Sequence, residues 1–313
     1  MKKMLNQELI QGKLFSHSLE KKIVKNDGPN KGKPFIQGAI QIQVDNEGLN
    51  VVEVYYSYIP EFTKAGKADR RFSTLSKIID NGRTVETDGP DAAMLVSATP
   101  AIALNDYYNI EKEEFGGYPR NEGGFLNIIT ASDLKENEAD RSRFETDVLI
   151  IGIKPVEEDE ERGIEEHAEL DARIFNFRGD IMPVKFQVYN PNAIKYFEGL
   201  EASTKNPVFT KIWGQVKSAT IKKTVTEENA FGEAAVKETH RTIREYVVTG
   251  AITEPYAFDD EATITAAELK KALEDRETYL AKVKGDRIAY EQSKGNATGG
   301  SNVKVSNDSA FDF

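Results

Sequence analysis

Residues 184–200, VKFQVYNPNAIKYFEGL, join a predicted strand directly to a short predicted helix, and this junction decides the fold. The segment 181–189 is the predicted strand. The segment 191–200 is the predicted helix, because apolar side chains recur every three residues at Ile194, Phe197 and Leu200. What precedes and follows this junction therefore determines the fold class.

Two predicted strands precede the third strand and its helix, and two follow. The five strands are 144–155, 168–177, 181–189, 208–223 and 241–252, with an acidic loop at 157–166 and a polar loop at 224–240. The order β-β-β-α-β-β is that of the OB-fold, a small Greek-key barrel that binds oligonucleotides and oligosaccharides. Gly152, inside the first of these strands, permits a barrel strand to curl sharply.

The preceding part of the chain is predicted to form a second OB-like module. Strands are indicated at 35–44, 49–59, 94–108 and 125–130, with a helix at 72–79. Residues 83–93 do not match the fold, and residues 1–33 are predicted to be polar and partly helical. A helix is predicted from Thr265 to about Ser293, opened by a capping box and interrupted at Gly285.

These patterns predict a mainly β protein with two OB-fold-like Greek-key barrels, a C-terminal helical segment and a disordered tail. The predicted domain boundaries are 1–33 for a polar N-terminal segment, 34–143 for an OB-like module, 144–256 for an OB-fold module, 257–294 for a helical segment, and 295–313 for a flexible linker with an acidic and aromatic tip.

Composition excludes several classes of function. The chain of 313 residues has no cysteine and three histidines, which excludes a disulfide framework and a thiolate metal site. No apolar stretch is long enough to span a membrane, and the N-terminus does not resemble a secretory signal, so a cytoplasmic protein is expected, in the host cytoplasm if phage-encoded. Nucleotide-binding, metalloprotease and serine-hydrolase motifs are absent, so we expect no catalytic residues, no metal and no cofactor.

In their order along the chain, four segments resemble single-stranded DNA-binding proteins of the OB-fold type. They are LIIGI at 149–153, the junction at 184–200, FTKIWGQVKSAT at 209–220, and the closing strand 243–249 followed by Gly250. In the first module, FIQGAI at 35–40 parallels KIWGQV at 211–216. Together with NEGGF at 121–125 and the tail, the chain looks like the single-stranded DNA-binding proteins of phages and mobile elements of Gram-positive bacteria.

The resemblance gives the end of the chain a role. Bacterial proteins of this type end in a flexible linker and an acidic tip with a terminal phenylalanine, which docks proteins of replication and repair. It implies that Asp308, Phe311, Asp312 and Phe313 bind replication or recombination proteins. The tip departs from the family in having only two acids and no proline, and a tail whose phenylalanines pack back on the body is the alternative.

Binding one strand requires flat rings for bases and cations for phosphates. The candidate rings are Trp213, Phe175, Phe177, Tyr56 and Tyr58. Phe175 and Phe177 would share one strand face, and Tyr56 and Tyr58 would share another, opposite Tyr55. The candidate cations are Lys211, Lys217, Lys222, Lys223, Lys64, Lys67, Arg70 and Arg71. For each ring the alternative is a place in the core, and for each cation an ordinary solvated surface.

The net charge of −11 does not exclude a nucleic-acid partner, because a local basic surface is what counts. The predicted function is sequence-independent binding and protection of single-stranded DNA during replication or recombination, without catalysis. The sequence is compatible with a monomer or a homo-oligomer. A structural or assembly protein of a phage particle and an RNA-binding OB-fold protein are the alternatives.

Overall fold

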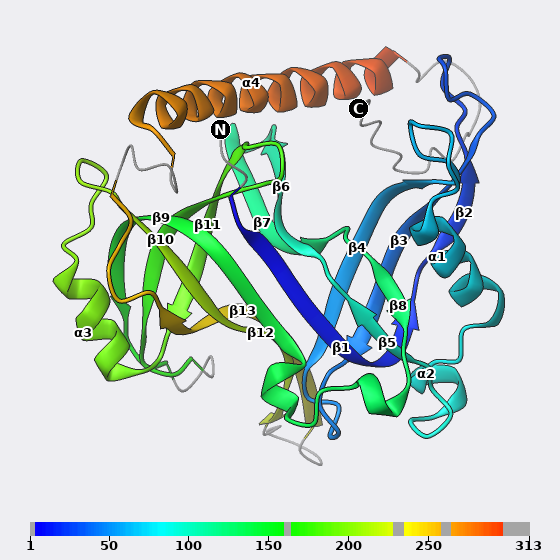
Figure 1. The fold of residues 1–313 in the computed structure, drawn as a ribbon, viewed down its shortest axis with the longest axis horizontal. Coiled ribbons are helices and arrows are strands. Elements are labelled where there is room, and N and C mark those ends of the chain that lie inside the picture. Colours follow the sequence, from blue (N-terminus) through cyan, green and yellow to red (C-terminus); the bar gives the residue numbers. More distant parts are fainter. Residues whose placement is uncertain (1–3, 160–163, 228–234, 258–263, 297–313) are drawn as a thin grey trace.

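The computed structural model describes residues 4–159, 164–227, 235–257 and 264–296, apart from the side chains of 219–227, 235–242 and 294–296. Within this part the protein is mainly β. Its strands form one thirteen-stranded sheet that curls into two barrels, and a long helix lies across one end of both (Figure 1).

The barrel later in the chain, barrel 2, has five strands and one helix. They are β9 (Ser142–Val156), β10 (His167–Phe175), β11 (Ile181–Val188), α3 (Pro191–Gly199), β12 (Val208–Glu227) and β13 (Ala235–Ala251). β10 joins β9 to β11, β11 pairs in parallel with β13, and β12 joins β13 back to β9. This closed Greek-key order, with the helix after the third strand, confirms the predicted OB-fold.

The earlier barrel, barrel 1, repeats the same plan. Its strands are β1 (Asn6–His17), β3 (Pro34–Gln43), β4 (Val51–Pro60), β5 (Leu95–Ala98), β6 (Ala101–Asn109) and β7 (Glu114–Glu122). β3 joins β1 to β4, β4 pairs in parallel with β7, and β7 pairs with β6. β5 precedes β6 across Thr99 and Pro100 and pairs with β1, which closes the ring.

Shorter elements complete barrel 1. Two helices follow β4 in the chain, α1 (Arg70–Asn81) and α2 (Val85–Asp88). β2 (Glu20–Ile23) pairs with β3, and β8 (Leu126–Ile128) pairs with β5. Two 3-10 helices, Ala131–Asp133 and Glu138–Asp140, lead into β9.

The predictions for barrel 1 differ from the structure in three places. The strand predicted at 94–108 is divided into β5 and β6. Residues 1–33 are not a polar, partly helical segment, because they contain β1 and β2. β1 shows no alternation of apolar and polar residues, since Glu8, Gln11 and Gly12 are buried along with Ile10. Strand β7, EFGGYPRNE, was not predicted either, since it carries two glycines and a proline and its first part is exposed.

The barrels are joined through the sheet. Residues Asn6–Ile10 of β1 pair with Ser142–Thr146 of β9, so one strand of barrel 1 extends the edge of barrel 2. The buried side chains of both barrels form one continuous cluster. Helix α4 (Ala266–Asn296) adds a second cluster on barrel 2, in which Leu269 and Ala272 pack with Phe175. The barrels are therefore held together by backbone hydrogen bonds and by packing.

Helix α4 runs through Gly285 without the predicted interruption, and a single glycine costs a helix only about 1 kcal/mol. Within the described ranges, no helix combines the length and the apolarity needed to cross a bilayer.

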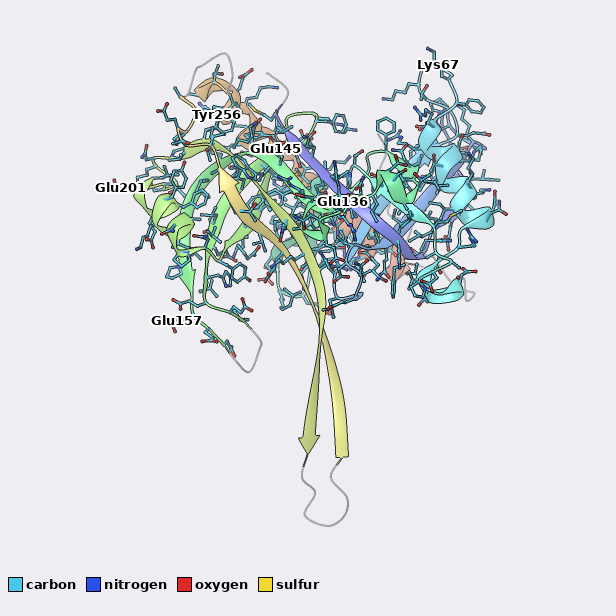
Figure 2. The ribbon with its side chains drawn as sticks, turned by 60° about the horizontal axis from the view of Figure 1, so that its bottom comes forward. Lys67, Glu136, Glu145, Glu157, Glu201 and Tyr256 are labelled. Atoms are coloured by element: carbon cyan, nitrogen blue, oxygen red, sulfur yellow. The ribbon has the colours of Figure 1, made fainter. Side chains whose placement is uncertain are left out.

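The segment predicted as a polar loop, 224–240, is partly strand. β12 continues to Glu227, β13 begins at Ala235, and the two pair along their length. The pair projects from the body as a two-stranded ribbon (Figure 2).

Candidate nucleic-acid interface

The outer surface of barrel 1 carries aromatic side chains on neighbouring strands. On β4, the residues Val52, Val54 and Tyr56 are buried, while Tyr55 and Tyr58 face outward. A β-bulge lies between the pairs Ile36–Ile59 and Gly38–Tyr56, so β4 has one residue more than β3 there. This extra residue places Tyr58 on the same side as Tyr55. The ring of Tyr58 lies against Phe35 of β3, with centroids 4.9 Å apart.

Arg120 of β7 extends this surface beyond β4. Its guanidinium lies 5.1 Å from the centre of the Tyr55 ring, and its Nη2 lies 2.7 Å from a carboxylate oxygen of Glu122. The side chain of Arg120 is 19% exposed. A guanidinium close to an aromatic ring makes a cation–π contact, and arginine contributes such contacts to the binding of single-stranded nucleic acids.

The β6–β7 hairpin continues the surface with two more rings. Tyr107 and Tyr118 are about half exposed, at 48% and 46%. Tyr118 is opposite Asn105, and Tyr107 is opposite Gly116. A Cβ on Gly116 would lie 2.3 Å from Cζ of Tyr107, so the ring rests directly on the glycine. We call the whole surface the aromatic stripe, defined as Phe35, Tyr55, Tyr58, Tyr107, Tyr118 and Arg120.

Basic loops border one end of the stripe. Residues 20–33 contain five lysines and two acids, and residues 61–71 contain four basic residues and two acids. Both segments lie beside Phe35, because β2 pairs with β3 and the backbone N–H of Glu61 donates to the carbonyl of Pro34 at 3.3 Å. Figure 2 shows Lys67 at this outer end of the molecule. An acidic protein thus has a locally basic surface next to exposed rings.

On β10 and β11, which correspond to β3 and β4 of barrel 1, barrel 2 lacks such a stripe. The outward positions of β10 and β11 hold charges that pair with each other and with β9: Lys154 with Asp171 at 2.7 Å, and Lys185 with Glu169 at 2.6 Å. These outward positions hold no aromatic side chain within the described strands. On these two strands, the barrel that resembles single-stranded DNA-binding proteins in sequence therefore offers no ring to a base.

Two of the predicted rings are buried, which corrects those assignments. Tyr56 and Phe175 are both 0% exposed, Tyr56 in the core of barrel 1 and Phe175 against Phe209 under α4. Tyr58 is on the stripe, as a base-stacking role requires. Phe177 is 75% exposed, but it lies in the turn after β10, with the guanidinium of Arg178 5.2 Å from its ring.

Trp213 is half-buried on the outer face of β12 and rests on Gly250 of β13. Its cross-strand neighbour in β9 is Glu145. The structure therefore does not bring Trp213 together with the stripe, and its contact with DNA stays a prediction.

Some of the predicted cations are exposed beside the stripe, some are held in ion pairs, and Lys217 lies on barrel 2. Lys64, Lys67 and Arg70 are exposed beside the stripe, whereas Arg71 binds the buried Asp69, the N-cap of α1, at 2.6 Å. Lys211 pairs with Glu145 at 3.1 Å, and this hydrogen bond raises the pKa of Lys211. Lys217 is exposed, with its ammonium 5.9 Å from the centre of the Tyr189 ring.

The side chains of Lys222 and Lys223 lie outside the described part of the ribbon, and the tip residues Asp308, Phe311, Asp312 and Phe313 lie outside the described residues.

Sequence reasoning missed Phe35, Tyr55, Tyr107, Tyr118 and Arg120 as binding candidates. The available signal was in EFGGYPRNE, where glycines follow and precede aromatic residues. Glycine inside a strand often marks the close approach of another group, and here Gly116 accommodates the ring of Tyr107.

Comparisons with known proteins complete the description of the chain. The single-stranded DNA binding protein from Thermus aquaticus, as a deletion mutant, has a TM-score of 0.48 and 10% identity, covering 83% of this chain and 100% of that one. The wild-type protein has a TM-score of 0.46 at 10% identity, covering 84% and 100%. A replication protein A heterotrimer bound to single-stranded DNA has a TM-score of 0.19 at 10% identity, covering 87% and 69%. No curated protein matches, and a family model described as YorF matches residues 5–307.

Proposed function

This chain belongs to the YorF family, and we propose that it binds single-stranded DNA through the aromatic stripe of barrel 1, without reading the base sequence. The observation that carries the proposal is the outward exposure of Tyr58, Tyr107 and Tyr118 on one barrel surface bordered by basic loops. OB-fold barrels use such a surface, with the loops beside it, to bind oligonucleotides.

The stripe supplies stacking energy without base selectivity. Every base has a π-face, and stacking on an aromatic side chain contributes roughly 1–3 kcal/mol per base. The rings lie on β3, β4, β6 and β7, and adjacent strands are about 4.8 Å apart. A single strand that crosses them would stack a few successive bases, and the Arg120–Tyr55 pair would add a cationic plane among the rings.

The basic loops supply the phosphate contacts. Lys64, Lys67 and Arg70 are exposed at the end of the stripe where Phe35 and Tyr58 meet. Each phosphate contact on a single strand releases counterions, so the slope of log affinity against log salt changes by about −0.7 per contact. Elsewhere on the outer surface, Glu145 beside Trp213 forms an ion pair with Lys211, and the outward acids Asp171 and Glu169 are paired with lysines, so the basic end of the stripe is the surface best suited to a polyanion.

The test is binding of a fluorescent oligo-dT of roughly 20 nucleotides, followed by anisotropy. We expect wild-type protein to bind, and Tyr118→Ala to lose about tenfold in affinity, from about 1.4 kcal/mol of stacking. Phe125→Ala is the matched control, since Phe125 is an aromatic side chain of barrel 1 that is 59% exposed but lies outside the stripe.

Equal affinities of the Tyr118 and Phe125 variants would refute the stripe as the site. Comparing the affinities for oligo-dU and oligo-U tests for a preference between DNA and RNA. Tighter binding of oligo-U would support the RNA-binding alternative. Indifference to all oligonucleotides would favour a structural role, such as that of a phage particle protein.

We further propose that the bound strand is protected during replication or recombination, and that the tip at Asp308, Phe311, Asp312 and Phe313 recruits proteins of those processes. The proposal rests on the composition of the tip, in which Asp312 lies between two aromatic side chains. Removal of residues 307–313 is expected to leave affinity for oligo-dT unchanged or slightly raised, because a competing anion is lost. A large loss of affinity would contradict this role.

A further inference from the structure

A buried ion pair connects helix α4 to the hairpin that carries half of the aromatic stripe. Two guanidinium nitrogens of Arg276 donate to the two carboxylate oxygens of Asp106 in β6, at 2.6 and 2.5 Å. The Asp106 side chain is 5% exposed and that of Arg276 is 15% exposed. About two helical turns further along, the Lys284 ammonium lies 4.9 Å from the centre of the Tyr108 ring. The bidentate pair between Arg276 and Asp106 fixes the hairpin to the helix in one orientation.

The contacts with α4 and the rings of the stripe lie on opposite faces of this hairpin. Successive side chains of a strand point to opposite sides, so Asp106 and Tyr108 face one way and Asn105 and Tyr107 the other. Tyr118 is paired with Asn105, so it shares the face of Tyr107. A Cβ on Gly117, opposite Asp106, would lie 3.2 Å from an Asp106 carboxylate oxygen, which places that carboxylate on the face toward α4.

The hairpin depends on this support because little else holds it. Among the described residues, β7 pairs with β4 only at Asn121 and Glu122. Toward its tip the hairpin therefore has only its own two strands, and an isolated pair of strands is marginally stable in water.

Helix α4 begins with a capping box and packs its first turns against barrel 2. The N–H of Glu268 donates to the Thr265 hydroxyl at 3.2 Å, and the Glu268 carboxylate accepts from the N–H of Thr265 at 3.1 Å. The same first turns pack Leu269 and Ala272 into the cluster with Phe175. The helix runs from barrel 2 across to barrel 1 (Figure 1). Its first turns make the core contact on barrel 2, and Arg276, further along, makes the ion pair on barrel 1.

From this arrangement we infer that Arg276 is a positioning residue of the DNA interface. Through Asp106 it holds the β6–β7 hairpin so that Tyr107 and Tyr118 align with Tyr55 and Tyr58. Arg276 does not touch the strand, and barrel 2 contributes to binding by carrying the helix. The inference rests on the proposed function, since it concerns the geometry of the same stripe.

The experiment measures affinity for oligo-dT in the full chain, with and without Tyr118→Ala. In Arg276→Met we expect a loss of about threefold to tenfold, and a much smaller further loss on adding Tyr118→Ala than in wild type, because contacts in one network are coupled. Arg287→Met is the matched control, since Arg287 forms an exposed ion pair with Glu291 within the same helix, at 2.8 Å; it should bind like wild type.

Two further variants keep the result interpretable if Arg276→Met does not fold. Arg276→Lys retains the charge but loses the two-pronged geometry and should show an intermediate loss. The charge exchange Asp106→Arg with Arg276→Asp should restore both the affinity and the sensitivity to Tyr118→Ala. A purely structural role would lower the melting temperature and leave the effect of Tyr118→Ala unchanged.

Besides that structural outcome, two results would overturn the inference, and they are distinguishable. If wild type binds and Tyr118→Ala weakens it, but folded Arg276→Met or Arg276→Lys binds like wild type, only the positioning role fails. If wild type does not bind oligo-dT at all, the proposed function fails and the positioning role with it.

Discussion

Glu8→Gln probes the junction of the two barrels, because a lone carboxyl group is buried there. Glu8 lies on β1 opposite Phe144 of β9 and is 4% exposed. Neither of its carboxyl oxygens has a hydrogen-bond partner among the described residues. Burial raises the pKa of Glu8 well above its ordinary value of 4.5. Nearby, burial and then the negative charge of Glu8 raise the pKa of the Tyr246 phenol.

The sign of the effect follows from the raised pKa. Below about pH 4.5 Glu8 is protonated in both the folded and the unfolded chain, and its contribution to stability is fully present. As the pH rises, the unfolded chain releases this proton while the folded chain keeps it. The free energy of unfolding therefore falls by about 1.4 kcal/mol per pH unit, up to the folded-state pKa. Glutamine does not titrate, so the variant lacks this contribution to the slope.

The assay is urea denaturation of both proteins from about pH 5 to about pH 8. We expect the stability of the variant relative to wild type to increase with pH, and subtracting the two curves cancels all other titrating groups. Any constant cost of burying the amide shifts the difference without changing its slope. A difference that is independent of pH would show that Glu8 ionises normally in the folded chain, and would refute the reasoning.

Two other predictions concern the aromatic side chains. Gly116→Ala should weaken oligo-dT binding by roughly tenfold without removing a ring, because the new methyl group would displace Tyr107; an unchanged Kd in the anisotropy assay would contradict this. Phe175→Ala should lower the free energy of unfolding by about 3–5 kcal/mol, whereas Phe177→Ala should change it by less than about 0.5 kcal/mol. Similar urea midpoints for the two variants would mean that Phe175 is not a core residue.

Barrel 2 could be predicted because each of its elements has a local signal. Helix α3 has apolar side chains on one face, with Phe197 in the core, and Asn190 at its N-cap. In β12 the buried residues Thr210, Ile212 and Val216 alternate with outward ones. Such periodicities arise where an element buries one face only. The order of these elements along the chain was then enough to predict the OB-fold.

Elements without one buried face were missed or misjudged. β1 lies between the barrels and buries Glu8 and Gln11 as well as Ile10, so it shows no strand periodicity. The first residues of β7 lie beyond the body of barrel 1 and are mostly exposed. In both cases the environment comes from strands distant in the sequence, which no local pattern records.

The aromatic residues of β4 show most clearly that a local pattern can predict a strand but not which of its side chains are exposed. Alternation along β4 predicts that Tyr56 and Tyr58 share a face opposite Tyr55, but the bulge against β3 turns Tyr58 to the side of Tyr55 and leaves Tyr56 in the core. One inserted residue reverses every later assignment in a strand, and the insertion exists only relative to the paired strand.

The sequence by itself determined the fold class, the order of strands in barrel 2, helix α3 and the long helix α4, because these depend on side chains near one another in the chain. Only the tertiary structure decided which rings are exposed, which barrel carries them and what holds them in place. Those properties depend on the pairing of distant strands and on contacts such as Arg276 with Asp106, separated by 170 residues.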